Sequence, residues 1–163
     1  MIRAPLRPRS PVCANDFLRV LTAEPMEVRR VLIDLRATAW PSCSEDILDR
    51  LELALAEVLN NIAEHGRPQG GITARPGGLR IHLAVRPRED GLCCVVWDDG
   101  APPPPGCFEL RDRRPSACPD PANLPEGGFG LCMLRDLVGP LAFTRLPRRN
   151  LLAFHLPNDA EAA

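Results

Sequence analysis

The sequence contains no lysine, so arginine supplies every positive side chain except those of the three histidines. Neither sign of charge dominates, because the formal net charge is −1 and the pI about 6.3. This balance gives no electrostatic reason to expect a nucleic-acid partner. No apolar run approaches the roughly 20 residues that a membrane-spanning helix needs, so no membrane association is expected either.

The cysteines do not form a recognisable set. There are seven, an odd number, and no two are spaced as Cys-x-x-Cys, which argues against a disulfide framework or a zinc site. The basic segment 1–11 is broken by prolines and lacks the apolar centre of a secretion signal. These absences predict a cytoplasmic protein whose reduced thiols behave as small hydrophobic side chains.

A chain of 163 residues suits a single domain. Its 19 prolines cluster near the N-terminus, at 102–105 and at 115–125, which is typical of loops. We predict an N-terminal arm at 1–14, a folded domain at 15–157 with a long proline-rich loop at 101–126, and a tail at 158–163.

Apolar periodicity predicts where helices and strands lie. Thr22 is the expected N-cap of the first helix and Ser44 that of the second. The expected helices span about 24–40, 44–65 and 130–138, and the expected strands 17–21, 79–86, 92–97, 141–146 and 151–156, with 147–150 as the last turn. Antiparallel strands beside segregated helices predict an α+β fold, a two-layer sandwich with helices on one face of a mostly antiparallel, mixed sheet.

Glu57 and Asn61 lie one helical turn apart, at the border of the apolar stripe of the helix at 44–65. An amide oxygen in a cleft suits Mg²⁺, which prefers oxygen ligands. Polar residues near a helix end are also commonly no more than solvated. The sequence alone leaves both interpretations open.

Two further segments carry polar or glycine residues at element ends. The apolar strand at 92–97 runs into Asp98, Asp99 and Gly100, where a carboxylate can accept from an exocyclic amine of a base; a plain turn is the alternative. Gly127, Gly128 and Gly130 precede or open the next helix, where free backbone N–H groups and the helix dipole favour an anion. A flexible hinge is the alternative there.

Taken in order, the three segments resemble a known family. The stretch Leu53–Gly66, with Glu57, Asn61 and His65-Gly66, resembles the N box of the GHKL superfamily, which includes histidine kinases and gyrase B. Its spacing is most similar to that of the anti-sigma-factor serine kinases. Asp98–Pro102 resembles their first glycine box and Gly127–Leu131 their second. The resemblance covers roughly residues 17–156 and implies the Bergerat ATP-binding fold.

The resemblance also implies roles for individual residues. Asn61 would ligate the Mg²⁺ that bridges the ATP phosphates, and Asp98 would accept from the adenine amine beside Gly100. The phosphates would lie near Gly128, Gly130 and Leu131, and residues 101–126 would form a lid. Glu57 would activate a serine hydroxyl of a partner protein. His65 would either bond near the phosphates or simply end its helix.

In function, the resemblance implies a serine/threonine kinase that binds ATP and Mg²⁺ and sequesters a sigma factor. It would phosphorylate a serine of a STAS-domain antagonist, and it would form a homodimer. The alternatives are a non-catalytic ATP-binding module and a detached histidine-kinase catalytic domain. The last is disfavoured because none of His65, His82 and His155 lies on an upstream dimerisation helix.

The sequence departs from the family pattern in two places. Residues 103–105 are all proline where relatives commonly have an aromatic residue, which predicts a stiffer start to the lid. Because lysine is absent, any cation at the γ-phosphate has to be an arginine. Arg111, Arg113 and Arg114 are the candidates, and a solvated charge run is the alternative.

Overall fold

The computed structural model describes residues 16–38, 40, 43–67, 77–104, 129–138 and 141–158. The side chains of 129–132 are outside the description. The elements in chain order are β1 (Phe17–Thr22), α1 (Pro25–Arg36), α2 (Glu45–His65), β2 (Arg80–Arg88), β3 (Gly91–Asp98), α3 (Phe129–Leu137), β4 (Leu141–Leu146) and β5 (Arg149–Pro157).

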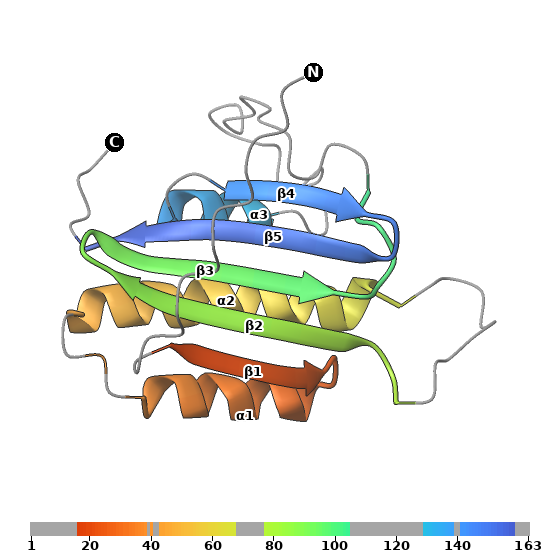
Figure 1. Cartoon of the computed structure of the whole chain (residues 1–163), viewed down its shortest axis with the longest axis horizontal. Coiled ribbons are helices and arrows are strands. Elements are labelled where there is room, and N and C mark those ends of the chain that lie inside the picture. The colour runs from red at the N-terminus through yellow and green to blue at the C-terminus, as the bar shows by residue number, and fades with distance from the viewer. Residues whose placement is uncertain are drawn as a thin grey trace, which may run out of the picture.

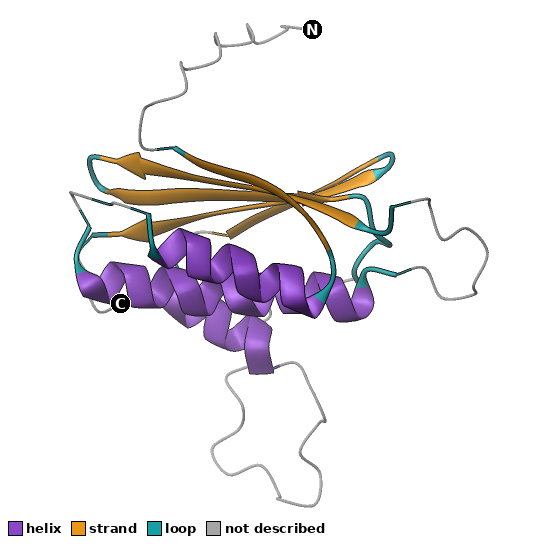
Figure 2. Ribbon diagram, turned by 90° about the horizontal axis from the view of Figure 1, so that it is seen from below, coloured by secondary structure: helices purple, strands orange, loops and turns teal. Residues whose placement is uncertain are grey.

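The strands form one sheet in the order β1-β2-β3-β5-β4, and all four pairings are antiparallel. The three helices lie together on one face of this sheet (Figures 1 and 2). No described helix covers the opposite face. The structure therefore confirms the predicted two-layer α+β sandwich, although the described strands pair only antiparallel and the sheet is not mixed.

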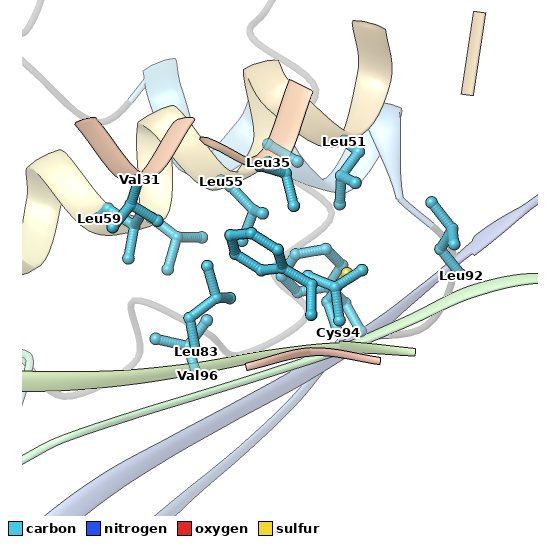
Figure 3. Packing of buried hydrophobic residues seen from close by; sticks show 14 of the residues in the cluster. Val31, Leu35, Leu51, Leu55, Leu59, Leu83, Leu92, Cys94 and Val96 are labelled. Atoms are coloured by element: carbon cyan, nitrogen blue, oxygen red, sulfur yellow. The ribbon is translucent and has the colours of Figure 1, made fainter. Parts of the chain in front are cut away.

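The core lies between the helices and the inner face of the sheet. The alternation of side chains along the strands sends Leu83 of β2, and Cys94 and Val96 of β3, toward the helices (Figure 3). The helical side of the cluster includes Leu51, Leu55 and Leu59 of α2 and Val31 and Leu35 of α1. Each fully buried leucine stabilises the fold by about 1.5–3 kcal/mol relative to exposure. Burial on this scale holds α2 firmly against the sheet.

The helix ends show one correct and one wrong prediction. Ser44 caps α2 as predicted, and its hydroxyl accepts from the Ile47 N–H at 3.3 Å. Thr22 does not cap α1, because it remains in β1 opposite Arg80, and Glu24 is the N-cap residue without a side-chain bond. Pro25 opens the helix, where its missing N–H costs no helical hydrogen bond.

The helix α1 also ends earlier than expected, at Arg36 rather than near Trp40. The indole N–H of Trp40 donates to the Leu35 carbonyl at 3.0 Å, so the chain turns back on the helix end. Among the described helices, none is long and apolar enough to cross a membrane.

Candidate functional site

Asp98 is the buried carboxylate at the end of β3. The alternation that buries Val96 places Asp98 on the same, helix-facing side, where it is 5% exposed. Its Oδ1 accepts from the Gly100 backbone N–H at 2.8 Å and from the Asn150 amide at 2.8 Å. No described residue donates to its second oxygen. Asp98 therefore offers one open, fixed acceptor.

Burial raises the pKa of the Asp98 carboxyl above its ordinary value, because removal from water disfavours the charged form. The bonds from Gly100 and Asn150 and the charge of Arg145 lower the pKa in part, and Asp99 raises it slightly. A carboxylate kept at a desolvated position despite this cost is typical of functional sites.

Asn150, which was not among the predicted site residues, holds Asp98 in place. Besides its bond to Asp98, its amide donates to the Ala101 carbonyl at 2.9 Å, and its oxygen accepts from Arg145 at 2.7 Å. The same Arg145 nitrogen also donates to the Gly100 carbonyl at 3.0 Å. Asn150 was predicted to lie in a turn, but β5 begins one residue before it. Asn150 lies two residues before Leu152 and therefore on the same, buried face of β5. A polar residue at such a position was the signal in the sequence that could have identified it.

Glu57 and Asn61 lie at the edge of the buried face of α2, where both are half-buried. The Asn61 amide nitrogen donates to Glu57 Oε1 at 2.7 Å. This bond fixes the orientation of the amide, since a carboxylate accepts from nitrogen and not from oxygen. The Asn61 carbonyl oxygen is therefore left to face another ligand.

The end of α2 contacts the end of β3 directly. The Ala101 N–H donates to the Gly66 carbonyl at 2.8 Å. A Cβ on Gly100 would lie 2.7 Å from that carbonyl oxygen and 2.8 Å from Asp98 Oδ1, so this position needs glycine. Close packing on α2 is a reason for Gly100 that the sequence did not reveal. These contacts bring the ends of two predicted motifs together.

The remaining predicted residues are placed in part. His65 is exposed at the end of α2, 3.9 Å from Glu64. Gly130 and Leu131 lie in the first turn of α3, which packs its Leu134 into the core. Gly128, the loop beyond 104, and the arginine candidates at 111–114 lie outside the described residues.

The sequence resemblance implies ATP binding, and we expect Asn150→Ala to weaken it about five- to tenfold, because a buried acceptor that loses a donor is destabilised. The pKa of Asp98 rises further in this variant, because the bond from Asn150 lowers it. On acidification, ATP binding is therefore lost at a higher pH than in the unaltered chain. Calorimetric titrations across a pH series measure both effects. Asn158→Ala removes an equivalent amide, bonded to the Glu89 carbonyl at the far end of the sheet, and should change neither; equal effects from the two variants would contradict the assignment.

Comparison with known families decides what this arrangement is. The model of the histidine kinase-like ATPase domain matches residues 21–155. The chain belongs to that family. A histidine kinase domain from the Erythrobacter litoralis EL346 blue-light activated histidine kinase is a similar solved structure, at 19% identity and a TM-score of 0.49. The match covers 82% of this chain and 60% of that one. A comparison with curated proteins gave no match.

Membership in the histidine kinase-like ATPase family gives the general biochemical kind, an ATP-binding domain of kinase type. The matched range includes α2, the end of β3 and most of β5. It therefore contains the four site residues Glu57, Asn61, Asp98 and Asn150. Among the described residues, Asp98 and Asn61 each have an oxygen without a donor, which fits a ligand that brings both an amine and a cation.

Proposed function

We propose that this ATPase-family chain is a serine/threonine kinase of the anti-sigma-factor type. It would bind Mg-ATP, phosphorylate a serine of a STAS-domain antagonist, and sequester a sigma factor, as a homodimer. The family match supports the ATP-binding part of this proposal. The Glu-x-x-x-Asn-x-x-x-His-Gly spacing of α2 supports the kinase type.

The ATP site is proposed mainly because of the buried hydrogen-bond acceptor at Asp98. The segment after Asp98 contacts the end of α2, since the Ala101 N–H donates to the Gly66 carbonyl. The open oxygen of Asp98 suits an exocyclic amine, because an ionised acceptor roughly doubles the strength of such a bond. The free oxygen of Asn61 suits Mg²⁺, which keeps several waters and takes few protein ligands. The residues present therefore fit both the base and the metal.

Glu57 supplies the carboxylate that a kinase needs beside the serine hydroxyl that receives the phosphoryl group. Its carboxylate is held by Asn61 at 2.7 Å, which places the candidate base one helical turn from the candidate metal ligand. A carboxylate within hydrogen-bond reach can take the proton of a serine hydroxyl as the phosphoryl group moves. Bound ATP and Mg²⁺ would supply the phosphoryl group and the charge neutralisation on which such transfer mainly depends.

The metal assignment is tested by Asn61→Ala. We expect ATP affinity in the presence of Mg²⁺ to fall at least tenfold, while affinity measured in EDTA changes little, because Asn61 acts through the metal. Titration calorimetry in both buffers measures this difference. Asn60→Ala is the matched control, since Asn60 is the adjacent asparagine and is exposed. If Asn61→Ala retained full Mg²⁺-dependent affinity, Asn61 would not be the ligand.

A further inference from the structure

A cavity of about 410 Å³ lies at the Asp98 end of the sheet, and its walls include residues of the face that lacks helices. His82 and Trp97 are cross-strand partners on β2 and β3, and their neighbours Ile81 and Val96 point into the core. His82 and Trp97 therefore face away from the helices, on the other side of the sheet from the Asp98 carboxylate. The cavity is lined by Gly78, Arg80, His82, Trp97, Asp98, Asp99, Arg148 and Arg149.

Three arginines, Arg80, Arg148 and Arg149, line this cavity together with two acids, Asp98 and Asp99. None of the three arginines forms an ion pair within the part of the chain that the structure describes. On the same face, Arg86 does have an acidic partner, Asp16, at 3.1 Å. The lining therefore carries one more cation than anions, and the arginines are not neutralised by ion pairs, which favours an anion.

Two aromatic side chains, His82 and Trp97, form part of the cavity wall. The rings of His82 and Trp97 meet edge to face, with centroids 5.8 Å apart and an interplanar angle of 73°. Flat aromatic walls beside arginines favour a ligand with a planar ring, since base stacking contributes about 1–3 kcal/mol per base. The volume is within the range of small-molecule sites, and it holds roughly a dozen waters at about 30 Å³ each.

We propose that this cavity is a second ligand site, which binds a mononucleotide with its phosphate on Arg80, Arg148 and Arg149 and its base against Trp97 and His82. Arginine is the side chain best suited to phosphate, because its planar fork donates two parallel hydrogen bonds. The cavity borders the proposed ATP site, because Asp98 lines it, but its arginines and its aromatic rings are not part of that site. The Asp98 carboxylate bonds on the helix side of the sheet, and the aromatic wall lies on the other side.

Tryptophan fluorescence tests this site directly. The chain has two tryptophans, and Trp40 is 6% exposed in the core, so a quench on titration reports Trp97. GMP is the probe, used with the full chain. We expect saturable quenching, a dissociation constant at least tenfold weaker in the double variant Arg148→Gln/Arg149→Gln, and no change in Arg88→Gln. Arg88 is the matched control, because it is an exposed arginine at the other end of β2.

Two further probes separate the phosphate from the base. Inorganic phosphate and guanosine should each bind at least tenfold more weakly than GMP. Quenching by GMP should persist in Asn61→Ala, which removes the proposed metal ligand of the ATP site and does not line this cavity, so the two proposals fail independently. Absence of saturable quenching at millimolar GMP, or an equal loss in Arg88→Gln, would overturn the second site. Phosphate binding as tight as GMP would do the same, because the ring would then contribute nothing.

Discussion

Asp98→Asn should weaken ATP binding about 10- to 100-fold, which is the loss expected for one hydrogen bond to a charged acceptor. The substituted amide keeps the shape of the side chain. Its oxygen can still accept from Gly100 and Asn150, which leaves an NH₂ group to face the exocyclic amine of the base. Two donors then oppose each other. Titration calorimetry with Mg-ATP measures the change.

The same substitution should leave the fold as stable as before, or more stable, at neutral pH. The pKa of Asp98 is raised in the folded state. Its contribution to stability is therefore fully present below the pKa of the unfolded chain and is lost as the pH rises through the raised pKa. Asparagine never ionises, so this loss does not occur, and thermal unfolding at pH 7 checks it. A large fall in Tm would show that Asp98 is structural.

Binding of ATP by the unaltered chain should also depend on pH. Protonation of Asp98 removes the charged acceptor, so affinity falls as the pH is lowered through its pKa. Because burial raises that pKa, the fall occurs at a higher pH than an exposed aspartate would give. Asp99→Asn is the matched control. Asp99 is the adjacent acid, its Oδ1 accepts from the Arg80 N–H at 2.9 Å, and an asparagine oxygen can do the same.

Glu57→Gln should reduce phosphoryl transfer to a serine of a STAS-domain protein by about 100- to 10,000-fold, the usual range for loss of a general base. ATP affinity should stay within about twofold, because the glutamine oxygen still accepts from Asn61. Transfer is followed with γ-labelled ATP, and affinity by calorimetry on the same preparation.

Glu64→Gln serves as the control for Glu57, since Glu64 is an exposed acid on the same helix. It should transfer phosphate at the rate of the unaltered chain. Equal rates for Glu57→Gln and the unaltered chain would remove Glu57 from catalysis. If neither protein transferred phosphate while both bound ATP, the result would favour a non-catalytic ATP-binding module over a kinase.

The layer architecture could be predicted from local pattern alone. Leu51, Leu55, Val58 and Leu59 recur at helical spacing, and the chain buries them as the period requires. Alternation in β2 and β3 likewise fixed which side chains face the helices. The adjacency of Glu57 and Asn61 followed from the geometry of one helix and needed no tertiary information.

The contacts made between distant segments were not predictable in the same way. Asn150 lies 52 residues from Asp98, and the bond between them depends on the register of β3 against β5. Arg145 reaches the site because β4 pairs with β5 and places it opposite Asn150. Thr22 was given a capping role by its residue type, but pairing with β2 kept it in the sheet. Local propensity was overridden in each case by strand pairing.

The most direct test is a crystal structure of the chain with Mn²⁺ and a non-hydrolysable ATP analogue, in which anomalous scattering locates the metal. We predict the adenine amine within hydrogen-bond distance of the open Asp98 oxygen, and a metal ion bound by the Asn61 oxygen at about 2.1–2.2 Å. Density for the analogue that lies away from both residues, for example against Trp97 and Arg149 alone, would contradict the assignment of the ATP site.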